Sequence, residues 1–306
     1  MKILVTGGTG FIGSHLIKRL INLKHDVFCI DINYPVGNNR YLSDEYTLIK
    51  GDICDRLFLS EINDERFDII FHFASNANVP LSVKEPYFDF TVNAIGTINM
   101  LEYARQTGVK KFIFASSVSI FDTCNKLPLD ENSKIKVTSP YGASKLTGES
   151  YCYAYYRSYG LNTNVVRFFN VYGEGVRKLF IYDMVKKVFN AETEVVIMGD
   201  GNQVRDYLFI DDLIDGIILV SEKGIDGEDY NIASGKKIAI IDIIKKITIY
   251  MNKPYLQIKP TNTSYPGDIK EWYADISKMQ KLGFNPKFDF DEALKRTIKD
   301  IVANIV

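Results

Sequence analysis

A glycine-rich turn near the start of the chain most constrains its fold. The sequence TGGTGFIG at 6–13 directly follows an apolar run at 2–6 and opens the first stretch of helical periodicity. Glycines at such a junction allow a tight turn, a close approach of the backbone to a pyrophosphate, and close packing of helix on strand. The N-terminus of the following helix adds oriented N–H groups and a partial positive charge. The predicted dinucleotide contacts are Gly7, Gly10, Phe11, Ile12 and Gly13.

Short β-rich runs alternate with helical stretches through the first half of the chain. Strands are expected at 2–6, 27–30, 68–72 and 111–116, with helices at about 11–24, 86–107 and 141–158. This alternation predicts parallel strands with right-handed crossovers, which is a doubly wound, Rossmann-like α/β sheet. We expect a dinucleotide-binding domain at 1–167 and a smaller substrate-binding lobe at 168–306. The segment at about 206–232 is expected to return to the first domain.

An acidic residue ends the second predicted strand. Asp31 lies about twenty residues after the glycines, where a carboxylate accepts hydrogen bonds from the adenosine ribose and repels a 2′-phosphate. NAD is therefore favoured over NADP, although Arg40 is a possible counter-signal. Asp52 and Ile53 follow the third short strand and are interpreted as an adenine clamp. The alternative for Asp52 is a turn residue that caps the next helix.

Charge and composition exclude several other functions. Lys and Arg total 37 against 38 for Asp and Glu, which provides no bulk field for nucleic acid or an anionic membrane. No apolar segment approaches the ~20 residues of a membrane span, so the cytoplasm is the expected location. Four cysteines and three histidines are scattered without metal-ligand spacing. We therefore expect no metal site.

A tyrosine and a lysine four residues apart indicate acid–base chemistry. Tyr141 and Lys145 share one face of the helix predicted after Pro140. A free phenol has a pKa near ~10, so a phenolate at neutral pH costs about 4 kcal/mol unless a cation stabilises it. Lys145 can supply that cation. The pair alone is common by chance, and a helical tyrosine is often a packing residue.

Together with the glycine turn, this pair resembles the extended short-chain dehydrogenase/reductase family. Further motifs carry the resemblance through almost the whole chain: HFAS at 72–75, VNAIGT at 92–97, RFFNVYG at 167–173, GDGNQVRDYLFIDD at 199–212 and PGDIKEWYADISK at 266–278. The resemblance implies NAD as cofactor and a nucleotide sugar as substrate. It implies that Ser117 hydrogen-bonds the reacting hydroxyl, that Tyr141 exchanges its proton, and that Lys145 also holds the nicotinamide ribose.

The resemblance implies further contacts on both sides of the reacting centre. Phe73, Ala74 and Asn93 are expected in the cofactor site, with Asn93 also supporting the active-site helix. Asn170 is expected at the phosphate end of the substrate. The family is commonly dimeric, and the helices at 86–107 and 141–158 would pair into a four-helix bundle in a homodimer.

The residues after the catalytic serine separate the reactions of this family. A 4,6-dehydratase needs an acid–base carboxyl there, and enzymes that epimerise C3 and C5 typically carry a cysteine. This chain has Ser117-Val118-Ser119, which disfavours both reactions. The remaining reactions of the family, at C4 of the sugar, need only the transfer of a hydride and one proton. Among the enzymes that catalyse them, the chain most resembles UDP-glucose 4-epimerases. An NAD(P)-dependent 4-ketoreductase or dehydrogenase of a nucleotide-linked deoxysugar or heptose is the alternative, and a nonenzymatic NAD-binding scaffold is a second one.

Some positions depart from the family pattern. Tyr265 stands where many epimerases carry a diphosphate-binding arginine, so Arg205 becomes the candidate diphosphate ligand, with a surface ion pair to Asp206 or Asp211 as its alternative. Phe121-Asp122 replaces the usual Tyr-Gly and is expected to change the pocket wall. Trp272, four residues after Asp268, is expected to line the sugar pocket and to exclude N-acetyl sugars; the alternative is that it packs between the lobes.

Overall fold

A parallel sheet forms the centre of the molecule. The computed structural model describes residues 1–33, 45–263 and 270–305. The strands of this sheet are β1 (Lys2–Thr6), β2 (Asp26–Asp31), β3 (Thr47–Lys50), β4 (Ile69–His72), β5 (Lys111–Ser117), β6 (Thr163–Phe168) and β11 (Asp229–Ile232). They pair in the order β11-β6-β5-β4-β1-β2-β3, and every pairing is parallel. Strand order reverses beside β1, and open α/β sheets bind ligands at such a point.

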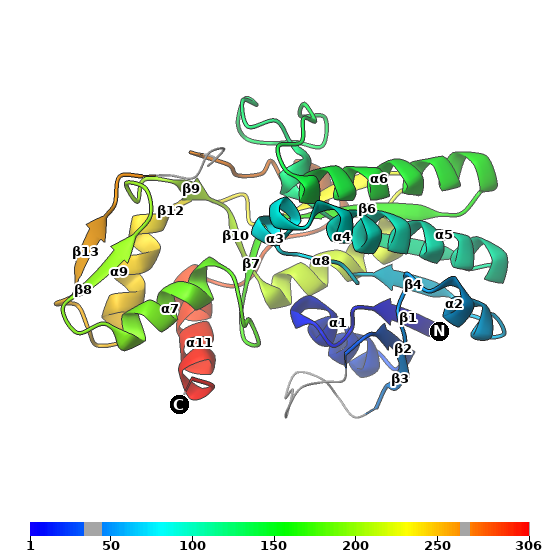
Figure 1. Cartoon of the computed structure of the whole chain (residues 1–306), viewed down its shortest axis with the longest axis horizontal. Coiled ribbons are helices and arrows are strands. Elements are labelled where there is room, and N and C mark those ends of the chain that lie inside the picture. The colour runs from blue at the N-terminus through cyan, green and yellow to red at the C-terminus, as the bar shows by residue number, and fades with distance from the viewer. Residues whose placement is uncertain (34–44, 264–269, 306) are drawn as a thin grey trace.

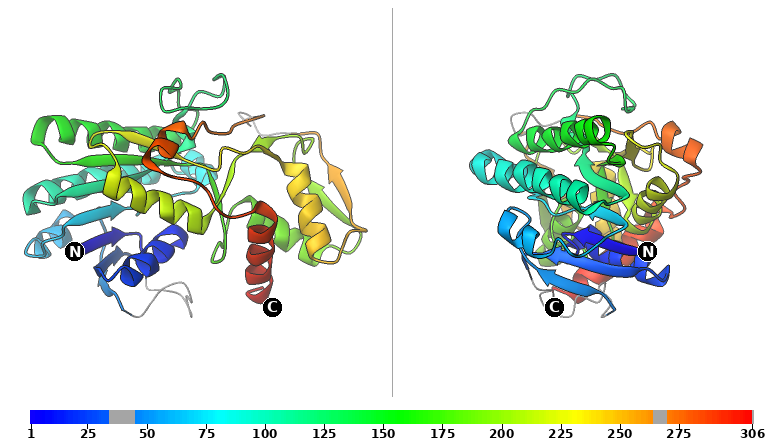
Figure 2. Two further views of the ribbon diagram at one scale, coloured as in Figure 1. Left: turned by 180° about the vertical axis from the view of Figure 1, so that it is seen from behind. Right: turned by 90° about the vertical axis from the view of Figure 1, so that its right-hand side faces the viewer.

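Helices cover both faces of this sheet (Figures 1 and 2). One face carries α1 (Phe11–Asn22), α8 (Ile210–Lys223) and the short α10 (Ser277–Leu282). The other carries α2 (Arg56–Glu61), α5 (Gly96–Thr107) and α6 (Pro140–Tyr159). A continuous run leads into α5 through α3 (Val79–Lys84), α4 (Pro86–Phe90) and the π-helical turn η1 (Thr91–Ile95). The predicted helices at 86–107 and 141–158 therefore lie side by side on one face.

Alternating residues of the strands contribute side chains to two separate hydrophobic cores. Ile3 and Val5 of β1 pack with the α1 and α8 face, whereas Leu4 packs with the α5 and α6 face. Both sides of the strand are buried, which explains why β1 and β5 are near-continuous apolar runs rather than alternating ones. The doubly wound fold class predicted from the sequence is confirmed.

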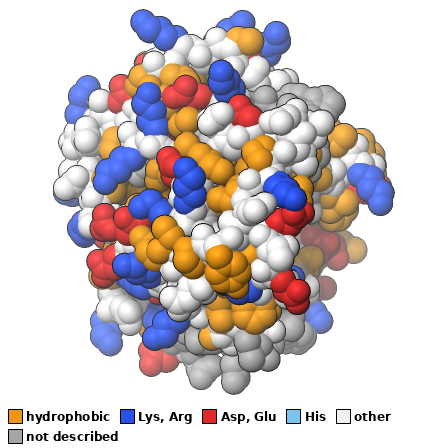
Figure 3. Space-filling view, turned by 90° about the vertical axis from the view of Figure 1, so that its left-hand side faces the viewer, with side chains coloured by type: hydrophobic (Ala, Val, Ile, Leu, Met, Phe, Trp, Pro, Cys, Tyr) orange, Lys and Arg blue, Asp and Glu red, His pale blue; other side chains and the backbone are white. Residues whose placement is uncertain are grey.

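The second half of the chain builds a smaller lobe beside the sheet (Figure 1). Among the described residues it contains three two-stranded sheets, which pair β7 (Asn170–Tyr172) with β10 (Tyr207–Phe209), β9 (Val204–Arg205) with β12 (Ile238–Ala239), and β8 (Glu194–Ile197) with β13 (Gln257–Pro260). Its helices are α7 (Phe180–Asn190), α9 (Ile240–Tyr250) and α11 (Phe290–Ala303). Figure 3 faces this lobe and shows hydrophobic side chains interspersed with charges of both signs.

The segment at 206–232 divides between the two parts. α8 packs on α1, and β11 is an edge strand of the large sheet. β10 pairs with β7 outside that sheet. The domain boundary at 167/168 stays a prediction. Within the described residues, no helix is both long and apolar enough to cross a membrane.

Candidate active site

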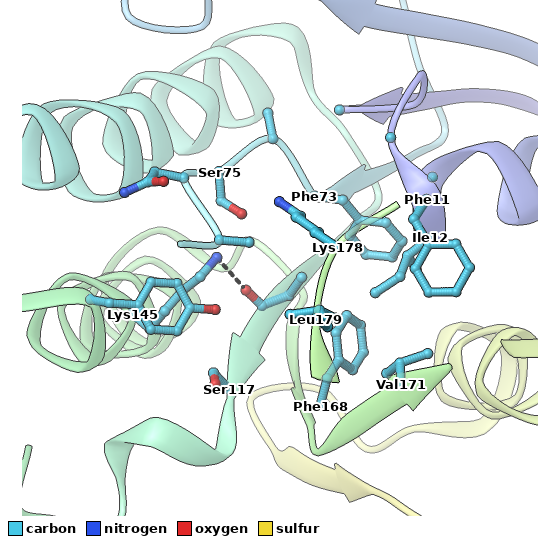
Figure 4. Close-up of a pocket in the computed structure, with 18 of the residues that line it drawn as sticks. Phe11, Ile12, Phe73, Ser75, Ser117, Lys145, Phe168, Val171, Lys178 and Leu179 are labelled. Carbon is cyan, nitrogen blue, oxygen red and sulfur yellow. Dashed lines mark hydrogen bonds between the residues drawn. The ribbon is translucent and has the colours of Figure 1, made fainter. Parts of the chain in front are cut away.

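A large cavity lies at the carboxyl ends of the strands, between the sheet and the smaller lobe. Its volume is about 820 Å³. The predicted residues in its lining comprise the glycine turn, Asp31, Asp52, Ile53, Phe73, Ala74, Ser117, Tyr141, Lys145, Asn170 and Trp272. Figure 4 shows Phe11 and Ile12 at one side of this space and Ser117 and Lys145 at the other. One continuous space therefore joins the predicted cofactor and catalytic residues.

The glycine turn is built so tightly that side chains would not fit. Gly7 has a φ of +70°, and a Cβ there would lie 2.6 Å from the backbone nitrogen of Ala74. A Cβ on Gly13 would lie 2.4 Å from the carbonyl oxygen of Gly7. The turn therefore presents bare backbone at the N-terminus of α1, which is the arrangement that binds a pyrophosphate. These residues fit a dinucleotide.

Asp31 lines the cavity beside the glycine turn. Its Oδ2 accepts hydrogen bonds from the backbone N–H and the hydroxyl of Thr9, at 3.1 and 2.7 Å. Oδ1 accepts the N–H of Asn33 at 3.1 Å. The carboxylate is thus fixed against the glycine turn. Arg40, the counter-signal for NADP, lies outside the described residues.

Asp52 and Ile53 lie in the turn after β3. Asp52 accepts the N–H of Cys54 at 2.8 Å, while Asp55 is the residue that caps α2 by accepting from Leu57 and Phe58. The alternative role of Asp52 as a helix cap is therefore wrong. Ile53 is buried against Gly96, where a Cβ would lie 2.6 Å from its Cδ1.

Tyr141 is positioned by the start of α6. Ser139 caps this helix by accepting the N–H of Gly142, and Pro140 occupies its first turn. A Cβ on Gly142 would lie 2.5 Å from the carbonyl oxygen of Ser119, so the turn after β5 packs directly on the helix. This contact brings Ser117 beside Tyr141. Burial raises the pKa of Tyr141 to about 12, against the opposing hydrogen bond with Ser117.

Lys145 is buried in the same wall of the cavity. Its Nζ donates to the carbonyl oxygen of Ala115 at 2.9 Å (dashed line in Figure 4) and lies 5.9 Å from the centre of the Tyr141 ring. Burial lowers the pKa of Lys145 to about 8, and the nearby carboxylates of Asp89 and Glu149 oppose that change. The ammonium is thus next to the phenol but bonded to the backbone.

Two predicted residues lie outside the cavity lining. The amide of Asn93 donates to Asp89 at 3.0 Å and to Ser144 at 3.1 Å, behind the helix that carries Tyr141. Arg205 donates to the carbonyl oxygen of Val204, and its guanidinium lies 5.3 Å from the centre of the Trp272 ring. The supporting role expected of Asn93 fits this geometry better than direct cofactor contact.

Neither alternative partner of Arg205 pairs with it. Asp206 is fully buried and accepts hydrogen bonds from Ser234, Gly235 and Ala274. Asp211 pairs with Arg296 instead. Tyr265, at the missing arginine position, lies outside the described residues.

Trp272 and Asn170 also line the cavity. The ring of Trp272 is partly buried against a cluster that includes Val118 and Phe169. The amide of Asn170 donates to the carbonyl oxygen of Asp206 at 2.9 Å, which ties the cavity wall to β9 and β10. Phe121 and Asp122, expected to change the pocket wall, are absent from the lining among the described residues: Phe121 is buried and Asp122 pairs with Lys134.

Sequence reasoning missed several polar lining residues, among them Lys178, Ser116 and Ser119. Lys178 lies in the loop before α7 and lines the cavity, with its side chain drawn between Ser75 and Phe73 (Figure 4). Ser116 is buried, and its hydroxyl has no hydrogen-bond partner among the described residues. Ser119 accepts a hydrogen bond from Ser117 at 3.2 Å. Only the position of the two serines beside Ser117 could have indicated them, because the placement of Lys178 depends on how the loop folds back.

The carboxylates in the described lining of the cavity lie far from Ser117. Among the described lining residues they are Asp31 and Asp52, at the ends of β2 and β3. Ser117 ends β5, three strand positions from β2, which corresponds to about 14 Å at ~4.8 Å per strand. Val118 and Ser119 follow Ser117 in the wall. The described residues also include no cluster of three or more His, Cys, Asp or Glu side chains suited to a metal ion.

Comparisons with known proteins agree with this geometry. The profile of the NAD dependent epimerase/dehydratase family matches residues 3–233. The structure is similar to UDP-glucose 4-epimerase with UDP-glucose from Thermotoga maritima, with a TM-score of 0.91, 33% identity and 100% coverage of both chains. It is similar to UDP-N-acetylglucosamine 4-epimerase from Methanobrevibacter ruminantium M1 in complex with UDP-N-acetylmuramic acid, with a TM-score of 0.89, 32% identity and coverage of 99% and 98%.

A relative with another activity is nearly as similar in sequence. The human dTDP-D-glucose 4,6-dehydratase is 30% identical over 97% of this chain and 89% of its own length. Sequence similarity alone therefore does not separate epimerisation from dehydration. With the glycine cradle, Ser117, Tyr141 and Lys145 around one cavity, the chain belongs to the NAD dependent epimerase/dehydratase family and is an NAD-dependent enzyme of that family.

Proposed function

We propose that the protein interconverts the C4 epimers of a nucleotide sugar of the UDP-glucose/UDP-galactose type through a transient 4-keto sugar. The observation that carries this proposal is the absence of a carboxylate near Ser117 among the described lining residues. Removal of a C5 proton and loss of the C6 hydroxyl need an acid–base group beside the sugar. Val118 and Ser119 offer none, whereas inversion at C4 needs only one proton-transfer group.

Tyr141 is the proposed proton-transfer group. Its phenol is protonated at neutral pH in the free protein, because a pKa of about 12 makes the phenolate cost roughly 7 kcal/mol at pH 7. Ser117 orients the C4 hydroxyl and donates to the phenolate, and the ammonium of Lys145 lowers the cost of that charge. Bound NAD supplies the hydride acceptor and donor for C4.

Three residues are proposed for the phosphate end of the substrate. Asn170 lines the cavity and offers an amide, and Lys178 lines it with an exposed ammonium. Arg205 stays a candidate if its guanidinium leaves the Trp272 ring when substrate binds. A cation is needed there because a diphosphate buried without one would be poorly solvated.

The proposal is tested with purified protein and a panel of UDP-, GDP-, CDP- and dTDP-hexoses. We expect inversion at C4 to an equilibrium mixture, detected by NMR of the sugar, without added reductant. A product lighter by one water would establish dehydration instead. The Lys178→Ala variant should raise KM more than it lowers kcat.

The 4-ketoreductase or dehydrogenase alternative uses the same three catalytic residues. It predicts stoichiometric consumption of external NAD(P)H or NAD, whereas an epimerase regenerates its cofactor in each cycle. Mass spectrometry of the denatured protein for co-purified NAD separates the two. NAD binding without turnover of any nucleotide sugar would instead favour the nonenzymatic scaffold.

We also propose that the protein forms a homodimer through α4, α5 and α6. Exposed aromatic side chains on this face support the proposal, because Tyr87 is 81% exposed and Tyr153 is 57% exposed. Analytical ultracentrifugation at micromolar concentration should give the mass of two chains. Tyr87→Glu should produce monomers, and a monomeric parent protein would refute the proposal.

A further inference from the structure

A buried carboxylate without a cation lies behind the catalytic helix. Asp89 of α4 is 0% exposed. Its Oδ1 accepts from the amides of Asn76 and Asn93 at 2.9 and 3.0 Å, and its Oδ2 accepts from the hydroxyl of Ser144 at 2.8 Å. In the described parts of the chain, no Lys or Arg nitrogen pairs with it within 4.0 Å. Burial of an unbalanced charge is costly, which indicates that this charge has a role.

The carboxylate is tied to the turn of α6 that carries the catalytic pair. Ser144 has one hydroxyl proton, which it directs to Asp89 or to the carbonyl oxygen of Tyr141 at 3.0 Å. The next residue is Lys145, whose Nζ is buried and bonded to the carbonyl oxygen of Ala115. The same network includes Asn93 in the π-helical turn η1, which packs on α6. The Ser144 hydroxyl therefore lies between the carboxylate of Asp89 and the backbone carbonyl of Tyr141.

The other ionisable groups around Lys145 are either paired or neutral. Glu149, one turn further along α6, accepts two hydrogen bonds from Arg167 at 3.0 and 2.8 Å. His72 of β4 is buried between two threonine hydroxyls, and burial followed by the charge of Lys145 lowers its pKa to about 3, so it is neutral. Tyr141 is protonated in the free protein. Asp89 is thus the negative charge near Lys145 that no cation balances.

We propose that Asp89 is a positioning residue whose buried charge acts on Lys145 and whose bond to Ser144 fixes the turn that presents Tyr141. This inference rests on the proposed roles of Tyr141 and Lys145. Burial alone favours the neutral amine, and the charges of Asp89 and then Glu149 oppose it. The same charge also raises the pKa of Tyr141, after burial. The charge of Asp89 therefore favours the protonated form of both members of the pair.

The variant Asp89→Asn removes the charge and can keep every hydrogen bond. The new amide oxygen accepts from Asn76 and Asn93, and the new amide nitrogen donates to Ser144. Ser144 then turns its proton fully onto the carbonyl oxygen of Tyr141. Ser144→Ala is the matched control, because it removes the hydroxyl and leaves the carboxylate. Glu149→Gln is a second control, which removes a charge that is paired with Arg167; Arg167 also pairs with Asp229.

The direct readout is the titration of Lys145 in the free protein by NMR of lysine labelled with ¹³C at Cε, with the signal assigned by its loss in Lys145→Met. We expect the midpoint in Asp89→Asn to fall by at least about half a pH unit. The midpoint of Lys145 should be unchanged in Ser144→Ala, and it should fall less in Glu149→Gln than in Asp89→Asn. In turnover, both limbs of the pH profile of kcat/KM should move to lower pH in Asp89→Asn.

An unchanged Lys145 midpoint in Asp89→Asn, or an equal shift in Ser144→Ala, would overturn the proposal. If Asp89→Asn does not fold, the shorter neutral variant Asp89→Ser gives the same test. The titration needs neither cofactor nor substrate. A protein that shows the expected midpoint shift but turns over no nucleotide sugar would refute the proposed function while leaving this inference intact.

Discussion

The two sides of the cavity are built by different means. The cofactor side consists of backbone at tightly packed glycines, where Gly7 and Gly13 leave no space for a Cβ. The opposite side consists of large side chains from separate segments, such as Lys178, Tyr207 and Trp272. Backbone geometry is fixed by a short local sequence, whereas side chains from distant segments depend on the whole fold. This difference explains why the cofactor is easier to infer than the sugar.

The largest expected effect lies where the two sides meet. Tyr141→Phe should keep cofactor affinity and lower kcat by a factor of roughly 10² to 10⁴, the usual loss for a general acid–base. Steady-state kinetics and NAD titration measure the two quantities. Lys145→Ala should lower both kcat and the affinity for NAD, because the amine is expected to contact both Tyr141 and the nicotinamide ribose. Near-normal turnover of Tyr141→Phe would remove the tyrosine from its role.

The glycine turn at 6–13 should not tolerate the addition of a single methyl group. Gly13→Ala places a Cβ 2.4 Å from the carbonyl oxygen of Gly7, and overpacking typically costs about 1 to 3 kcal/mol, so NAD affinity should fall by roughly 5- to 150-fold. Gly108→Ala is the control, since a Cβ there meets nothing within 4 Å. It should alter thermal stability only. Unchanged NAD affinity in Gly13→Ala, measured by calorimetry, would contradict the backbone account of this side.

The substrate side should instead accept a smaller side chain and change its preference. Trp272→Cys is expected to shift the ratio of kcat/KM for UDP-N-acetylglucosamine over UDP-glucose upward by about 5- to 100-fold, since the indole occupies space that an acetamido group needs. Phe121→Leu, in the buried cluster behind the cavity, serves as the control. A parent enzyme that already prefers the N-acetyl sugar, or an unchanged ratio, would show that Trp272 only packs between the lobes.

The smallest effect is expected from the fixed carboxylate on the cofactor side. Asp31→Ala should narrow the preference for NAD over NADP by about tenfold, because a 2′-phosphate no longer meets a negative charge. Thr9→Val removes one hydrogen bond to the same carboxylate and should change the preference less. Competitive binding of NAD and NADP measures this preference in each variant. Tighter binding of NADP by the parent protein would show the assignment of Asp31 to be wrong.

The same contrast explains how far the sequence alone could lead. The glycine turn, Asp31 and the Tyr141–Lys145 spacing are local patterns, and the sheet follows from alternating elements. The position of Asn93 behind α6 could not be read from spacing, because it depends on η1 packing against Ser144. The position of Lys178 in the cavity could not be predicted from the sequence either. It depends on how the loop at 173–179, which leads into the smaller lobe, folds back toward the cavity. Phe121 was expected to change the pocket wall, but the turn after β5 buries its side chain.

The most direct test of the central claim uses a nucleotide sugar with deuterium at C4. UDP-[4-²H]glucose is incubated with the purified enzyme without added cofactor, and the product is analysed by NMR and mass spectrometry. The account predicts UDP-galactose that retains deuterium at C4, because the hydride removed from C4 returns to the same carbon on its other face. Loss of water from the sugar, or conversion only with added NAD(P)H, would contradict it.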